Sequence, residues 1–350
     1  MQNYTTLKYI DFRDCEFLTE TPDFSTIPNL ERLNLEGCTS LVKIHNSVGY
    51  LAKLVFLSVE FCSNLKSISS HFRLRSLQTL LLTGCSKLEK FPDIEDKMAC
   101  IERVSLNSTA IKELPLSIEN LVGLKVMTLS FCRNLSRIPS SIYKLQHLKR
   151  LLLDGCSELT TFPENMPEET PPFCSNISMI ANNDIMWFPM LTCLDLQNCK
   201  LSEVDFLMNL VCFSTLKDLD LSGNNFVNLP TCINRFTKLR RLELANCIWL
   251  EGIPELPRSI KRIGARNCTS LESYSELVRV FMFNTEDRST KLHDLDFSNC
   301  HKLADQNPLQ SFADTSSRCI SVDEVGLPHC FLKSLFVCIC LYVYSETLQA

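Results

Sequence analysis

The sequence predicts an α/β solenoid in which short parallel strands stack on one side and irregular turns or short helices cover the other. Three observations support this fold class. The chain has 350 residues and is 45% hydrophobic, which is enough to bury a large core. The pattern L-x-x-L-x-L-x-x-C, with apolar substitutions, recurs twelve times. Ten of the 19 cysteines occupy the ninth position of that pattern.

The repeated pattern has the spacing of a leucine-rich repeat. Its first seven starts are 23 or 24 residues apart, and a period of about 20 to 29 residues with this pattern is typical of that repeat. Apolar residues at the fourth and sixth positions point to one face of a strand, and neighbouring strands must stack to bury that face. We therefore expect a horseshoe with a parallel β-sheet on its concave side. The twelve units start at Leu7, Leu30, Leu54, Leu77, Ile101, Leu124, Leu148, Leu191, Leu216, Leu239, Ile260 and Leu292.

The second half of each unit predicts the convex side. A second apolar pair is followed by proline, as in Leu135, Ile138 and Pro139. Proline stops a helix and turns the chain towards the outer side. Segments such as SSIYKLQHL then predict a short, partly helical turn.

The ninth positions predict a structural ladder along the solenoid. Asparagine at this corner bonds the backbone of the turn, and a small cysteine can do so weakly. Thr109 takes the place of the ladder residue in one unit. Disulfides or a metal site are the alternatives, but neighbouring thiols about 4.8 Å apart would project in parallel. The odd number of cysteines also favours a reducing compartment. The predicted ladder residues are Cys15, Cys38, Cys62, Cys85, Cys132, Cys156, Cys199, Asn224, Cys247, Cys268 and Cys300.

The period divides the chain into a solenoid over residues 1–304 and a non-repeat tail over 305–350. Between the starts at Leu148 and Leu191 the gap is 43 residues and rich in proline. We expect an irregular insertion over 164–190, in which residues 177–185 could still form a weak strand. The tail contains an apolar segment over 330–344.

The apolar segment has 15 residues and contains Lys333, whereas a membrane span needs about 20. A flap on the last repeat, or the tail of a truncated gene product, is favoured over a membrane anchor. The first residues lack the basic and apolar regions of a secretion signal. We expect the chain in the cytoplasm, or shared between nucleus and cytoplasm.

Composition and motifs argue against catalysis. The net charge of −5 excludes the basic footprint of a nucleic-acid-binding domain. Phosphate-binding, metalloprotease and hydrolase motifs are absent, and the six histidines are scattered. We expect no enzyme activity, no catalytic residue, no cofactor and no metal.

Two blocks of sequence resemble a known family. LTETPDFSTIPNLERLNLEGCTSLVKIHNSVGYLAKL (18–54) and IPELPRSIKRIGARNCTSLES (253–273) are similar to the first and last repeats of plant TIR–nucleotide-binding–leucine-rich-repeat disease resistance proteins. The resemblance covers about residues 1 to 304. It implies effector recognition and autoinhibition in plant defence. The TIR and nucleotide-binding motifs are missing, so we expect a fragment or truncated form without the NAD-cleaving and nucleotide-switch activities.

The positions between the ladder leucines predict a partner-binding surface on the concave face. Apolar side chains on a shared face indicate a protein interface, and arginines commonly border one. The alternative is that the aromatic rings pack against one another or are shielded. Acidic side chains gather later, at Asp195, Asp218, Asp220, Glu243, Asp294 and Asp296. The candidate partner-binding residues are Phe56, Phe61, Leu81, Val126, Phe131 and Leu152, with a basic stripe of Arg32, Arg103, Arg150, Arg241 and Arg262.

The expected partners are proteins: a pathogen effector, a host protein guarded by the receptor, or the receptor's own TIR and nucleotide-binding domains. An F-box-type substrate adaptor of a ubiquitin ligase is the alternative, because such repeats also use cysteine in the ladder. Its repeats run nearer 26 residues, and no F-box-like helical segment precedes Leu7.

Overall fold

A computed structural model describes residues 4–163, 188–210, 212–272 and 294–305. The chain forms two compact units, one built from 1–201 and 205–216 and the other from 202–204 and 217–350. Each is a leucine-rich-repeat solenoid and is described by itself. Most of the predicted insertion and nearly all of the predicted tail, including the apolar segment 330–344, lie outside the described residues.

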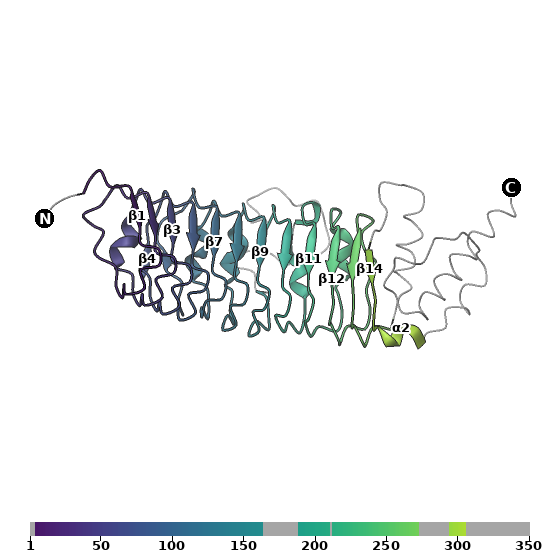
Figure 1. Cartoon of the computed structure of the whole chain (residues 1–350). Coiled ribbons are helices and arrows are strands. Elements are labelled where there is room, and N and C mark those ends of the chain that lie inside the picture. The colour runs from purple at the N-terminus through teal and green to yellow at the C-terminus, as the bar shows by residue number, and fades with distance from the viewer. Residues whose placement is uncertain (1–3, 164–187, 211, 273–293, 306–350) are drawn as a thin grey trace, which may run out of the picture. The chain divides into compact units, whose positions relative to one another are not determined.

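The first unit is built on a parallel sheet in which each repeat adds one strand of three residues (Figure 1). Equivalent repeat positions face one another across every pair, as Arg103, Val126 and Arg150 do. The middle residue of each strand points inward, because successive side chains of a strand alternate between its two faces. From β2 onward this residue is buried. The strands are β1 (Tyr9–Asp11), β2 (Arg32–Asn34), β3 (Phe56–Ser58), β5 (Thr79–Leu81), β7 (Arg103–Ser105), β8 (Val126–Thr128), β9 (Arg150–Leu152) and β10 (Cys193–Asp195).

The second unit repeats this arrangement. Its parallel strands are β11 (Asp218–Asp220), β12 (Arg241–Glu243), β13 (Arg262–Gly264) and β14 (Asp294–Asp296). The short helix α2 (His301–Asp305) follows the last of them.

Short 3₁₀ helices occupy many of the segments that were predicted as partly helical turns. In the first unit they are η1 (Asn46–Tyr50), η2 (Leu116–Asn120), η3 (Ser140–Lys144), η4 (Asp205–Asn209) and η5 (Cys212–Ser214); the second unit has η6 (Thr231–Arg235). Pro115, Pro139 and Pro230 precede η2, η3 and η6, each with φ near −70° and extended ψ. The proline ring sets this φ, and each of these three prolines is the N-cap residue from which a 3₁₀ helix starts.

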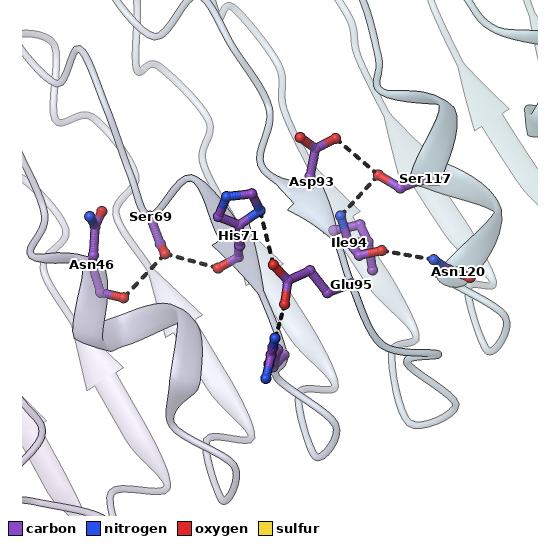
Figure 2. A network of polar contacts seen from close by, with 9 residues as sticks. Asn46, Ser69, His71, Asp93, Ile94, Glu95, Ser117 and Asn120 are labelled. Atoms are coloured by element: carbon purple, nitrogen blue, oxygen red, sulfur yellow. Dashed lines mark hydrogen bonds and ion pairs between the residues drawn. The ribbon is translucent and has the colours of Figure 1, made fainter.

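A second, two-stranded parallel sheet was not predicted. It joins β4 (His71–Phe72) and β6 (Asp93–Ile94). Polar side chains tie this small sheet to the 3₁₀ helices beside it (Figure 2). Asn120 Nδ2 donates to the Ile94 carbonyl oxygen at 2.7 Å, and Ser117 Oγ accepts from the Ile94 N–H at 2.9 Å. His71 Nδ1 lies 3.1 Å from Glu95 Oε1.

The ladder cysteines from Cys38 onward are buried free thiols. Each donates its Sγ–H to the carbonyl oxygen of the sixth residue in the preceding repeat, as Cys62 does to Leu35 at 3.0 Å. Cys132 Sγ makes this bond to Leu106 at 3.0 Å and also lies 3.2 Å from Thr109 Oγ1. The thiols thus satisfy corner carbonyls along both units. Cys15 departs from the predicted core ladder, because it is exposed in the first described repeat.

Alkylation should separate the ladder thiols from the exposed ones. Burial raises the pKa of Cys62 to about 12 and that of Cys132 to about 11, so few thiolates form. Cys15 and Cys100 are exposed. We expect iodoacetamide at pH 8 to label Cys15 and Cys100 at least about a hundredfold faster than Cys62 or Cys132. Peptide mapping by mass spectrometry measures these rates, and fast labelling of the ladder in the folded chain would contradict the burial.

Candidate protein-binding surface

The strand face of the first unit is the outward side of its sheet, formed by the third and fifth residues of the repeats. Its third positions run Arg32, Phe56, Thr79, Arg103, Val126 and Arg150 from β2 to β9. The arginines are exposed and the apolar side chains partly exposed. The alternation of strand residues therefore places these predicted site residues in one row.

Arg32 and Phe56 form the first pair on this row. The guanidinium carbon of Arg32 lies 4.3 Å from the centroid of the Phe56 ring. A cation over the ring face is attracted by the electrons of the ring. Phe56 is thus partly covered, as the shielding alternative expected, while the Arg32 side chain stays exposed.

Arg103 and Arg150 lie on either side of Val126. They are two strands apart, or roughly 9.6 Å by the spacing of a sheet. Within the described part of the chain, neither guanidinium makes a hydrogen bond or an ion pair. Two arginines without partners beside an apolar side chain form a surface suited to carboxylates.

The fifth positions form a second row, with Leu81 and Leu152 separated by hydroxyl groups. Ser105 Oγ lies 2.8 Å from Thr83 Oγ1 and 3.0 Å from Thr128 Oγ1. The hydroxyls between the two leucines therefore bond to one another. The Ser105 and Thr128 hydroxyls at the centre of this row are thus satisfied, which favours contact of an apolar partner group with this row, beside the charged third positions.

Phe61 and Phe131 lie at the eighth positions, in the turns that follow β3 and β8. Both rings are 54% exposed. The six predicted apolar residues consequently occupy three repeat positions, the third, the fifth and the eighth. The sequence pattern shows that Phe61 and Phe131 share the eighth repeat position. It does not show that the turn places both rings away from the strand residues.

The predicted basic stripe is neutralised in the second unit. Glu243 is nearly buried, and its Oε1 accepts from Arg241 Nε at 2.9 Å and from Arg262 Nε at 2.7 Å. Arg262 also lies 3.1 Å from Asp294 Oδ2. These arginines are therefore held in an ion-pair network, unlike Arg103 and Arg150. Burial raises the pKa of the neighbouring Asp220 above its ordinary value.

A glycine makes room for the Glu243 carboxylate. Gly264 occupies the fifth position of the next repeat, and a Cβ there would overlap Glu243 Oε2. Sequence reasoning missed this network because its residues lie on adjacent repeats. The strand register could have revealed it, since Arg241 pairs with Arg262 and Glu243 with Gly264.

Among the residues that the structure describes, no helix is long and apolar enough to cross a membrane. No group of three or more His, Cys, Asp or Glu side chains in these segments could hold a metal ion.

The strands, the ladder and the strand face together define a leucine-rich-repeat module. Residues 72–277 match the family described as "Disease resistance protein RPS4B-like, leucine-rich repeats". The chain belongs to this family of plant disease resistance proteins. The assignment gives no support to the F-box adaptor alternative.

Individual relatives agree with this assignment. The chain is 33% identical over 326 residues to disease resistance-like protein DSC1 of Arabidopsis thaliana, which is 85% of this chain and 26% of that protein. It is 30% identical over 289 residues to TMV resistance protein N of Nicotiana glutinosa, covering 74% of this chain and 25% of that protein. The chain thus spans about a quarter of the length of these curated relatives.

A solved structure of another leucine-rich repeat domain, that of the type III effector XopL, aligns with a TM-score of 0.49 at 23% identity. The alignment covers 64% of this chain and 69% of that one.

Proposed function

We propose that this chain is the protein-recognition module of a plant immune receptor and binds its protein partner on the strand face of the first unit. The observation that carries the proposal is the pair of exposed arginines, Arg103 and Arg150, which have no ion-pair or hydrogen-bond partner among the described residues and lie beside partly exposed Val126. Apolar and arginine side chains in this combination are enriched at protein interfaces. The family assignment supports a role in plant defence.

Recognition would serve two ends in such a receptor. A pathogen effector or a guarded host protein would occupy the strand face when defence is triggered. The receptor's own TIR and nucleotide-binding domains would use contacts with the repeats to keep the receptor inactive beforehand. We further propose that the chain acts by binding alone, without catalysis or cofactor, in the cytoplasm or in both nucleus and cytoplasm.

A double substitution tests the binding surface. Phe56→Ala combined with Phe131→Ala should weaken partner binding by at least about 2 kcal/mol, or roughly 30-fold, if these rings are hot spots. The partner would be isolated from plant extract on the immobilised chain, identified by mass spectrometry, and titrated by calorimetry. Leu116→Ala is the matched control, because Leu116 is 74% exposed on η2, outside the strand face. Equal affinities for the double variant and the control would refute a binding site formed by the strand face together with the Phe131 turn.

A further inference from the structure

The turn after each repeat strand contains a residue in the left-handed conformation, and after β10 a second one, Lys200, follows. The residue common to all twelve repeats is at the eighth repeat position, with φ between +55° and +78°. Residues without a Cβ, or with a short polar side chain, adopt this region most readily. The twelve occupants are Asp14, Gly37, Phe61, Gly84, Ser108, Phe131, Gly155, Asn198, Gly223, Asn246, Asn267 and Asn299.

Phe61 and Phe131 are the two residues with large apolar side chains among these twelve. Their φ values are +60° and +59°, and a left-handed residue that is not glycine costs roughly 1–2 kcal/mol. A bulky residue kept at such a position is a reason to look for a function. The other ten repeats use Gly, Asn, Asp or Ser at this point.

Both phenylalanines use the same local arrangement. Each ring lies over the left-handed glycine of the following repeat. A Cβ on Gly84 would stand 2.8 Å from Phe61 Cδ1, and one on Gly155 would stand 2.6 Å from Phe131 Cδ1. The same arrangement, a phenylalanine whose ring lies over the glycine at the equivalent position of the next repeat, therefore occurs twice in the first unit.

The two rings are spaced for a single ligand. Phe61 follows β3 and Phe131 follows β8, and these strands are three steps apart in the sheet. At about 4.8 Å per strand the separation is roughly 14 Å. Small residues, Gly84 and Ser108, occupy the two turns between them. An extended peptide crossing the strands covers this distance in four residues, at about 3.3 Å each.

The charges on the strands that flank β8, at the third repeat position and thus five positions before that of Phe131, favour an acidic ligand. Arg103 and Arg150 stand on the strands that flank β8. Two carboxylates of these repeats have partners: Glu102 forms an ion pair with Lys125, and Asp154 accepts a hydrogen bond from Ser130 Oγ. Glu60 is next to Phe61, so the Phe61 half carries a negative charge beside its ring.

From these observations we infer that Phe61 and Phe131 are twin anchors for one acidic, extended protein segment that crosses the strands. Two of its apolar side chains, four residues apart, pack on the rings, and a carboxylate near the second reaches Arg103 or Arg150. This inference rests on the proposed function and specifies the partner's chemistry.

A random peptide library tests the inference without knowledge of the natural partner. A phage-displayed library of twelve-residue peptides would be selected on the whole chain, and its enriched peptides titrated against variants. We expect an apolar pair at positions i and i+4 with Asp or Glu near one of them. Phe61→Asn and Phe131→Asn should each weaken binding at least tenfold, and the double variant at least a hundredfold, while Leu116→Asn changes nothing.

Substitution by asparagine distinguishes a role of the two rings in binding the ligand from a role in stabilising the turns. It occupies the left-handed position in four repeats, so relief of backbone strain should offset the lost ring contacts. We expect the melting temperature of each Asn variant to stay within about 3 °C of the original. A larger fall in both variants would mean that the rings hold the turns together, and would overturn the inference.

Two binding results would also overturn it, with different consequences for the proposed function. Peptides that lose affinity in Phe56→Ala but keep it in the double Asn variant would leave the strand face as the binding site without the twin anchors. If none of these substitutions changes the affinity of the peptides, neither the two rings nor the strand face is the binding site.

Discussion

Replacing Tyr143 with alanine is expected to lower the free energy of unfolding by about 3–5 kcal/mol, as for other large buried aromatic residues. Its side chain is 1% exposed, at the centre of an aromatic cluster. The Tyr143 ring centroid lies 6.0 Å from that of Phe162 and 5.1 Å from that of Phe188. Phe162 in turn lies 4.6 Å from Phe206. Removal of the central ring would leave a cavity bordered by Phe162 and Phe188.

Tyr143→Phe is the matched control for this prediction. It keeps the ring and removes only the hydrogen bond from the Tyr143 hydroxyl to the Pro163 carbonyl oxygen, which measures 2.5 Å. We expect it to cost about 1 kcal/mol. Urea unfolding followed by circular dichroism gives both values. Equal losses in the two variants would mean that the hydroxyl, and not the packing of the ring, dominates the stability at this point.

The aromatic cluster also shows where sequence reasoning reached its limit. The strands and the ladder could be predicted because they follow a local period. Residues 164–190 interrupt that period and are rich in proline, so the whole segment was predicted as an insertion. Phe188 nevertheless belongs to the core, buried against Tyr143. That contact joins residues 45 positions apart, and no local pattern indicates it.

The candidate surface was predictable to a similar degree. Strand alternation correctly places Phe56, Val126 and Arg103 on the outward face. It does not reveal which arginines are neutralised, because that depends on the residue in the neighbouring repeat. Arg262 is paired through Glu243, whereas Arg150 has no such neighbour. The residues of a single strand therefore do not predict the net charge that the strand face presents to a partner.

The repeat architecture explains how such a surface can vary while the fold persists. The core uses the first, fourth, sixth and ninth positions, which pack against equivalent positions in adjacent repeats. The third, fifth and eighth positions face outward and vary more in residue type. Some fifth positions are nevertheless buried, as Glu243 is, and some positions have no room for a Cβ, as at Gly264. The eighth position still imposes its left-handed backbone, so Phe61 and Phe131 are departures with an energetic cost. Recognition residues and solenoid residues are thus separated within each repeat.

Gly123→Ala is expected to destabilise the first unit by about 3 kcal/mol, at the upper end of the range for overpacking. Gly123 follows η2, and its N–H donates to the Met98 carbonyl oxygen at 3.2 Å. A Cβ at this position would overlap the Ala99 carbonyl oxygen and stand 2.9 Å from that of Ile101. These are backbone atoms of the preceding turn, so no side-chain rotation can relieve the clash, and the two turns would have to separate.

Gly264→Ala provides the comparison, because there the overlapping atom ends a flexible side chain. The Glu243 carboxylate can rotate away from an alanine at 264, with the loss of its bonds to half-exposed Arg241 and Arg262. We expect a cost of about 1 kcal/mol, since such arginines regain water. Urea unfolding of the two variants should rank Gly123→Ala as the more severe. The reverse order would show that neighbouring repeats move apart more easily than the ion-pair network reorganises, and that the solenoid is held mainly by its surface charges.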